Sequence, residues 1–122
     1  MRIGLLSDIH GNLSALQAVA GRLAAEAPLD QIVVAGDHLL GGPRPVEVWR
    51  YLRTAGWMLI RGNEDEALLS EEPPDLDALH RYARAYEAQR RWTRQRLGMD
   101  LLQQLAALPD RYRLPTPAGT LL

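Results

Sequence analysis

The sequence predicts an α/β fold built on a mostly parallel sheet. Three short apolar runs, at residues 3–6, 31–35 and 57–60, have the length and composition of buried strands. Apolar residues at helical spacing fill the segments between these runs. This β-α-β-α-β order favours parallel pairing through right-handed crossovers, with both connections made by helices.

The two crossover helices have clear boundary signals. The first follows Asn12 or Ser14 as a candidate cap and stops before Pro28. The second begins at Pro45, a residue preferred in the first helical turn. It ends at Gly56, which suits the position just after a helix because glycine adopts left-handed backbone angles readily.

The second half of the chain has a different character. Glu71 to Asp75 is rich in proline and acid and predicts a turn or linker. After it the sequence predicts helices at about 75–97 and 100–108, a strand at 111–114, a turn at 115–119 and the start of a strand at 120–122.

Composition excludes several classes of protein. The 14 basic and 15 acidic residues nearly cancel, so there is no strong case for nucleic-acid binding. The absence of cysteine excludes a disulfide framework and a thiolate zinc site. No apolar run is long enough for a signal peptide or a membrane span. We therefore expect a soluble, cytoplasmic protein with no membrane partner.

Polar side chains follow each of the three predicted strands. Carboxyl ends of parallel strands share one edge of a sheet, where ligands bind in α/β proteins. Oxygen donors mixed with imidazole suit Mn, Fe, Zn and similar divalent ions. Each residue alone could equally be a cap or a turn residue, but all of them fall at the same end of successive strands. The residues are Asp8 and His10, then Asp37, then Asn63, Glu64 and Asp65.

The segments SDIHGN, GD followed by GGPRP, and RGNED resemble the signature of calcineurin-like metallophosphoesterases, in particular their small bacterial phosphodiesterase branch. The resemblance implies the calcineurin-like phosphoesterase fold, an αββα sandwich of mixed sheets, here truncated to its N-terminal part with a helical insertion. It makes residues 1–122 a single metallophosphoesterase domain, incomplete at the C-terminus, with residues 70–108 as a helical cap segment.

The same resemblance implies a dinuclear metal site. Asp8 and His10 would bind one ion, Asp37 would bridge both ions, and Asn63 would bind the second. Manganese is the ion that the resemblance favours for both positions, and Fe, Zn, Ni and Co are the alternatives. A hydroxide activated by the pair would hydrolyse a phosphodiester or phosphomonoester substrate.

Catalytic and substrate-binding residues are assigned in the same way. Glu64 stands where the family has a histidine that serves the leaving group, and Asp65 matches the acid that orients it. We therefore expect Glu64 and Asp65 to be catalytic. Arg44 and Arg61 flank the expected site and are candidates for binding phosphate.

The chain departs from the family pattern at its end. The family has a later histidine and a Gly-His-x-His motif, but no histidine follows His80 before the sequence stops at Leu122. We therefore expect weakened metal binding and weak or absent hydrolysis. The alternatives are a non-catalytic binding or interaction module and a fragment of a longer enzyme. An open sheet edge also predicts self-association into a homo-oligomer.

The stretch from His80 to Arg96 holds six arginines with Tyr82, Tyr86 and Trp92 between them. One interpretation is a cap that receives an anionic substrate. We favour the other, a solvated helix whose aromatic side chains face the core while the arginines lie over them.

Overall fold

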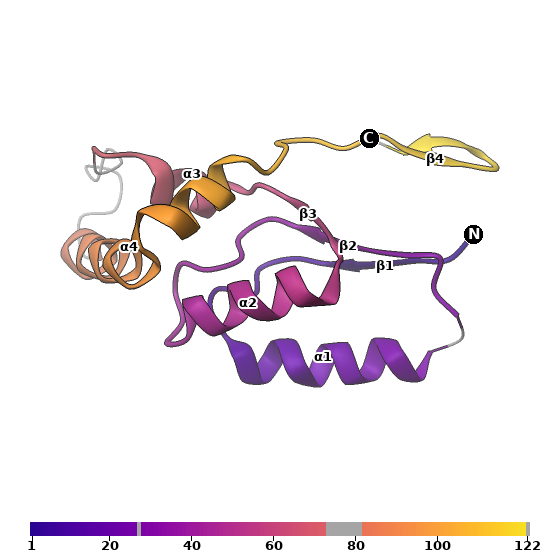
Figure 1. Ribbon diagram of the computed structural model, residues 1–122, viewed down its shortest axis with the longest axis horizontal. Coiled ribbons are helices and arrows are strands. Elements are labelled where there is room, and N and C mark those ends of the chain that lie inside the picture. Colours follow the sequence, from indigo (N-terminus) through magenta and orange to yellow (C-terminus); the bar gives the residue numbers. More distant parts are fainter. Residues whose placement is uncertain (27, 73–81, 122) are drawn as a thin grey trace.

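Three parallel strands form the centre of the protein. The computed structural model describes residues 1–26, 28–72 and 82–121. Strands β1 (Ile3–Leu6), β2 (Gln31–Ala35) and β3 (Met58–Ile60) pair in parallel in the order β1-β2-β3. Helices α1 (Leu13–Ala25) and α2 (Pro45–Ala55) both lie on one side of this sheet (Figure 1). The predicted α/β class, parallel sheet and crossover order are confirmed.

The helix boundaries have the expected chemistry. The Oδ1 atom of Asn12 accepts a hydrogen bond from the Ala15 amide at 3.0 Å, which satisfies one free N–H group of the first turn of α1. Pro45 opens α2, and Gly56 closes it in the left-handed conformation with φ 67°. Asn12, rather than Ser14, is therefore the cap of α1.

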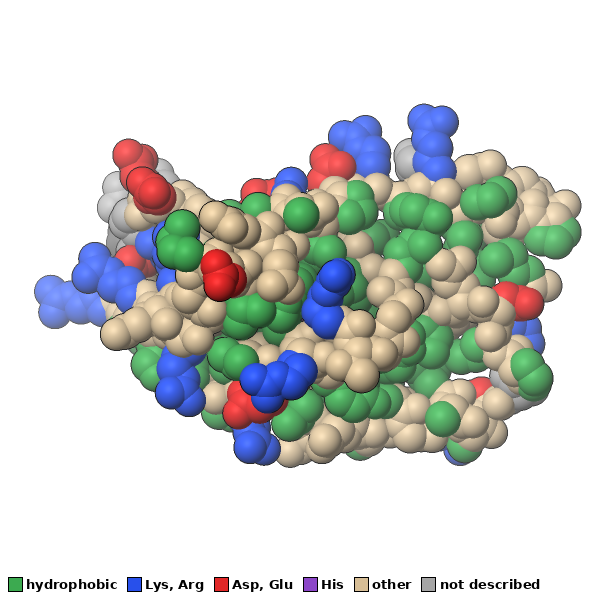
Figure 2. Space-filling model, in the orientation of Figure 1, with side chains coloured by type: hydrophobic (Ala, Val, Ile, Leu, Met, Phe, Trp, Pro, Cys, Tyr) green, Lys and Arg blue, Asp and Glu red, His purple; other side chains and the backbone are tan. Residues whose placement is uncertain are grey.

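The main core lies between the sheet and helices α1 and α2. Leu6, Val34 and Leu59 are opposite one another in neighbouring strands and face these helices. Trp49 and Leu52 of α2 pack into the same core. Alternate strand residues face the other side, where Leu5 is 66% exposed. Apolar side chains are also spread widely over the face seen in Figure 2. Self-association of the chain stays a prediction.

Helix α3 (Asn63–Leu69) was not predicted. The Asp65 carboxylate accepts a hydrogen bond from the Gly62 amide at 2.9 Å and so caps the start of this helix. Three acidic residues in the first turn also favour a helix there, because the helix dipole is positive at that end. The sequence Asn-Glu-Asp-Glu therefore begins a helix directly after β3 instead of forming a loop.

Helix α4 (Ala83–Ala106) is interrupted at Gly98, whose φ of 72° and ψ of 171° are not helical. This break confirms the predicted division into two helices near residue 98. The predicted start of the first helix, at residue 75, lies outside the described residues. Residues before the break contact α3, whereas Gln104, after it, accepts a hydrogen bond from Trp49 of α2 at 3.0 Å.

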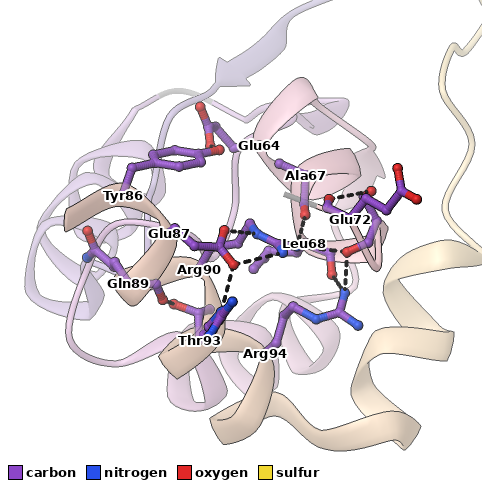
Figure 3. Close-up of polar contacts among 12 residues, drawn as sticks. Glu64, Ala67, Leu68, Glu72, Tyr86, Glu87, Gln89, Arg90, Thr93 and Arg94 are labelled. Carbon is purple, nitrogen blue, oxygen red and sulfur yellow. Dashed lines mark hydrogen bonds and ion pairs between the residues drawn. The ribbon is translucent and has the colours of Figure 1, made fainter. Parts of the chain in front are cut away.

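Two arginines of α4 bind the C-terminal end of α3. Arg90 donates to the carbonyl oxygens of Ala67 and Ser70 at 3.0 and 2.7 Å (Figure 3). Arg94 donates to Leu68 and to Ser70. These guanidinium groups satisfy carbonyls that have no partner within α3 and complement the negative end of its dipole. Arg90, which is 2% exposed, therefore docks the two helices together.

The predicted orientation of the aromatic residues on this helix is partly wrong. Tyr86 is half-buried and faces α3, but Tyr82 and Trp92 are exposed. The reason is that Arg90, Thr93 and Leu97 occupy the buried side of the helix, which turns Tyr82 and Trp92 outward. Arg96 lies over the exposed Trp92 ring at 5.6 Å from its centre.

A short antiparallel ribbon of β4 (Leu114–Thr116) and β5 (Gly119–Leu121) ends the described chain. The first strand begins three residues later than predicted. The Thr116 hydroxyl donates to the Gly119 carbonyl and accepts from the Ala118 amide, so the turn is confined to two residues. None of the helices in the described part of the chain is long and apolar enough to cross a membrane.

Ionisation of Glu87 should make the unfolding free energy of the protein depend on pH in the acid range. Its hydrogen bond to Arg90, and a second one to Arg91, lower the pKa of Glu87 from 4.5 to about 2. A lowered pKa means that the stabilisation is complete above about pH 4.5 and is lost as the pH falls toward 2. We expect Glu87→Gln to reduce the unfolding free energy at neutral pH and to weaken its fall in acid, as measured by urea titration.

Exposed Glu72 offers a matched control for this measurement. Glu72→Gln should leave both the unfolding free energy and its pH profile close to wild type. A Glu87→Gln protein with the wild-type acid profile would contradict the assignment.

Candidate metal centre

Asp8, His10 and Asp37 meet at the carboxyl ends of β1 and β2. Each offers one ligand atom, and these atoms all lie within 4.8 Å of one another. The two segments are held together by backbone hydrogen bonds, from the Asp8 amide to Gly36 at 3.3 Å and from the His10 amide to Asp37 at 2.9 Å. Parallel pairing of β1 and β2 therefore brings the three side chains together at one edge of the sheet.

These three residues share an uncommon backbone conformation. Asp8, His10 and Asp37 have φ angles of 57°, 50° and 57°, and no other non-glycine residue in the described ranges has a positive φ. Such angles are unfavourable for residues with a Cβ atom and concentrate at functional sites. The surrounding hydrogen bonds must therefore hold these side chains in place at the expense of backbone strain.

The imidazole of His10 is oriented by a backbone carbonyl. Its Nδ1 atom lies 2.6 Å from the Leu40 oxygen, which can only accept, so Nδ1 carries the proton. The Nε2 atom then faces Asp8 Oδ1 at 3.4 Å and is the atom that can bind a metal. Burial lowers the pKa of His10, but the Leu40 bond and the carboxylates of Asp8 and Asp37 outweigh burial and raise it overall.

The two carboxylates of the cluster are held differently. Asp8 is exposed, and its hydrogen bonds with the Ser7 hydroxyl and with His10 lower its pKa. Asp37 is half-buried, and its Oδ1 atom accepts from the Glu64 amide at 3.0 Å. Both groups present acceptor oxygens toward His10, and together they form a hard, anionic donor set suited to a divalent ion.

Asp65 is fully buried and bonds to four donors. It accepts from the backbone amides of Asp37, His38 and Gly62 at 2.9 to 3.0 Å and from the His38 ring at 2.7 Å. Burial raises the pKa of Asp65, but these hydrogen bonds outweigh burial and lower it. Because no part of Asp65 is exposed, its carboxylate faces the protein and not a substrate. The structure places Asp65 where it orients the two strand-end loops and the His38 ring, and its expected part in catalysis stays a prediction.

His38 was missed by sequence reasoning. It is fully buried, and its Nε2 atom has no hydrogen-bond partner among the described residues. The family pattern gave Asp65 a histidine partner at position 64, but glutamate occupies that position and His38 supplies the imidazole from the other loop. The sequence signal for His38 was its place between Asp37 and two leucines, which indicates a buried ring. A buried imidazole needs a hydrogen-bond partner that is also buried.

Glycines let the two strand-end loops touch. Gly36 has φ 89°, and a Cβ atom there would lie 2.5 Å from the Gly62 Cα atom. A Cβ atom on Gly62 would lie 2.3 Å from an Asp37 carboxylate oxygen. The close approach places Asn63, the first and exposed residue of α3, directly after the glycine that contacts Asp37. Its role as a ligand stays a prediction.

The remaining predicted site residues are in varied surroundings. Glu64 is half-buried, and its Oε2 atom accepts from the Tyr86 hydroxyl at 2.7 Å (Figure 3). Burial and the hydrogen bond to Glu64 raise the pKa of Tyr86. Arg61 donates to Glu66 at 2.5 Å and to the Ala106 carbonyl at 2.6 Å, so its guanidinium already has partners.

Arg44 is exposed at the start of α2, and its side chain lies 3.6 Å from the Glu47 carboxylate. A loose ion pair of this kind at the surface contributes little to stability. Of the two arginines expected to bind phosphate, Arg44 is therefore the one whose charge is more readily available.

A sequence model of calcineurin-like phosphoesterases matches residues 1–118. The chain belongs to this family. A metallophosphoesterase from Sphaerobacter thermophilus has a similar structure, with a TM-score of 0.64 and 32% identity over 93% of this chain. A putative diadenosine tetraphosphatase gives a TM-score of 0.60 and 27% identity over 88% of this chain. The chain covers 43% of each of these two structures.

Curated relatives agree with the family. The symmetrical bis(5'-nucleosyl)-tetraphosphatase of Serratia proteamaculans is 32% identical over 68 residues, which is 54% of this chain and 24% of that protein. An uncharacterised protein of Methanocaldococcus jannaschii is 30% identical over 107 residues, which is 88% of this chain and 42% of that protein. The chain thus spans less than half the length of these relatives.

The close contact between Gly36 and Gly62 predicts that a methyl group added at Gly36 will strongly reduce stability. Gly36→Ala would place a Cβ atom against Gly62 at a positive φ, so we expect a loss of about 2 kcal/mol or more in unfolding free energy. Gly21 has open space around it within α1, and Gly21→Ala should stabilise the protein by about 0.5–1 kcal/mol. Urea unfolding of both variants measures the contrast, and equal stabilities would refute it.

Removal of the Asp65 charge should also be costly. In Asp65→Asn the side-chain amide would face N–H donors, and we expect a loss of about 3 kcal/mol or more in unfolding free energy. Asp110 is exposed, so Asp110→Asn should stay within about 0.5 kcal/mol of wild type. An Asp65→Asn protein as stable as this control would show that the buried carboxylate is not a structural anchor.

Proposed function

We propose that this chain carries the metal-binding part of a metal-dependent phosphoesterase. The observation that supports this most directly is the convergence of Asp8, His10 and Asp37, all at positive φ, with ligand atoms within 4.8 Å. A carboxylate pair with an oriented imidazole is a donor set for Mn²⁺ and similar ions. The residues present therefore fit the ions that the family uses.

Within this proposal, Asp8 and His10 would hold one divalent ion, Asp37 would serve both ions, and Asn63 would hold the second. Divalent ions in such a site neutralise phosphate charge and supply Lewis acidity for the attack of water on phosphorus. Manganese is the first ion to test. The protein's own contribution is to fix the ligands, through the Leu40 carbonyl on His10 and the Glu64 amide on Asp37.

Three side chains beside the cluster complete the proposed site. Arg44 would attract the phosphate, because its guanidinium is exposed near the loop that follows β2. Glu64 would lie beside the leaving group, and Asp65 would position both strand-end loops. Because relatives are named bis(5'-nucleosyl)-tetraphosphatases, dinucleoside polyphosphates are the substrates to try first. We place this activity in the cytoplasm.

A binding module without hydrolysis is the second candidate. The observation that favours it is Glu64, a carboxylate at the position where the family has a leaving-group histidine. An ionised Glu64 beside a bound phosphate would add repulsion. The two candidates differ in turnover and not in metal binding.

Asp37→Asn separates these candidates from a protein with no metal site. Asparagine tolerates the positive φ of residue 37, so the fold should persist while a bridging charge is lost. We expect Mn²⁺ affinity to fall at least about tenfold by calorimetric titration. Hydrolysis of bis(4-nitrophenyl) phosphate, if present in the wild type, should fall with it.

Exposed Asp100 provides the control, and Asp100→Asn should bind Mn²⁺ as the wild type does. Equal Mn²⁺ affinity in Asp37→Asn and wild type would refute the metal site. Metal binding by the wild type without hydrolysis of a phosphodiester or a dinucleoside polyphosphate would favour the binding module.

A further inference from the structure

The first half of α4 contributes none of the proposed ligands, yet it contacts two chain segments that adjoin the metal cluster. The Tyr86 hydroxyl donates to Glu64 Oε2 at 2.7 Å. One turn further along, the Gln89 side chain donates to the Gly41 carbonyl at 2.5 Å. Glu64 belongs to the first turn of α3, whereas Gly41 belongs to the loop that follows β2. One helix therefore contacts two segments that are separate in the sequence.

Each of these contacts leads directly to a proposed ligand. The backbone amide of Glu64 donates to Asp37 Oδ1 at 3.0 Å, so a displacement of Glu64 would move the donor that orients Asp37. Gly41 lies against the His10 ring, since a Cβ atom on this glycine would be 3.2 to 3.5 Å from three atoms of His10. Its neighbour Leu40 accepts the His10 Nδ1 proton. Asp37 and His10 are thus each one contact away from a residue held by α4.

The helix is firmly enough attached to act as a brace. Arg90 and Arg94 bind the carbonyls at the end of α3, on the same side of the helix as Tyr86 (Figure 3). Glu87 holds the Arg90 guanidinium at 2.8 Å. Arg90 and Thr93 are both buried at this contact. The position of the Tyr86 hydroxyl is therefore set by packing against α3 and not by its single hydrogen bond.

We propose that Tyr86 and Gln89 are positioning residues of the metal centre, which fix Asp37 through Glu64 and His10 through Gly41. This inference rests on the proposed function for the identity of the site, but its contacts join residues of this chain alone. Groups that orient metal ligands from outside the coordination sphere typically change metal affinity 10- to 100-fold when they are removed. The helical cap would then tune the metal site without supplying a ligand.

The test uses the full chain with single substitutions that remove one donor each. Tyr86→Phe deletes only the hydroxyl, and Gln89→Met keeps the length of the side chain without its N–H group. We expect each to weaken Mn²⁺ binding about tenfold in calorimetric titration and to change the visible spectrum of bound Co²⁺. Matched controls are Tyr82→Phe, on the exposed Tyr82, and Gln95→Met, on the exposed Gln95; both should bind as the wild type does.

Hydrogen–deuterium exchange of the metal-free protein provides the second measurement. Tyr86→Phe should speed exchange at the Glu64 amide, which donates to the Asp37 carboxylate. Gln89→Met should speed exchange at the Gly11 amide, which donates to the His38 backbone carbonyl in the loop that contains Gly41. Exchange elsewhere should stay unchanged. Faster exchange throughout the chain would indicate global destabilisation and would overturn the local role.

Two outcomes separate this inference from the proposed function. Variants that match the wild type in both Mn²⁺ affinity and exchange would overturn the inference and leave the metal site intact. A wild-type chain that binds neither Mn²⁺ nor Co²⁺ would overturn the proposed function. In that case, faster exchange confined to the Glu64 and Gly11 amides would still support the positioning role of Tyr86 and Gln89, and unchanged exchange would overturn it.

Discussion

The buried carboxylate of Asp65 holds the two strand-end loops in one arrangement. Three backbone amides, two from the loop after β2 and one from the loop after β3, point at the same carboxylate, and the His38 ring adds a fourth donor. Buried charge of this kind is tolerated only when it is fully hydrogen-bonded. This arrangement brings Gly36 into close contact with Gly62. It also fixes the start of α3 and the orientation of Asp37. The buried Asp65 carboxylate therefore supports the site without being exposed to a substrate.

A second layer of support comes from α4. Its first half is joined to α3 by arginine–carbonyl contacts and reaches across to Glu64 and Gly41. Its second half, beyond Gly98, packs on α2 and receives Arg61 at the Ala106 carbonyl. Two of the arginines that suggested an anion-binding cap, Arg90 and Arg94, thus donate to carbonyls at the end of α3. Arg90 and Arg94 are structural, whereas Arg96 lies over an exposed ring.

Local signals explain what could be predicted from the sequence. Short apolar runs, the Asn12 cap, Pro45 and Gly56 each act within a few residues, and the elements they predict are present. Asp8, His10 and Asp37 were predictable because parallel strands end at a common edge. His38 and Tyr86 were not, because their partners are 27 and 22 residues away and depend on how separate elements pack. Helix α3 was missed because acidic residues suited to a helix start also suit a metal site.

The positive φ angles at Asp8 and Asp37 also limit how this site can change over generations. Asparagine and aspartate are the non-glycine residues that adopt this conformation most readily. The replacement that disturbs the backbone least is therefore the one that removes a negative charge from the ligand set. A lineage that drifted in this way would keep its architecture and its surface while losing its affinity for ions. Descent from an enzyme to a protein without a metal site would then need few steps and little loss of stability.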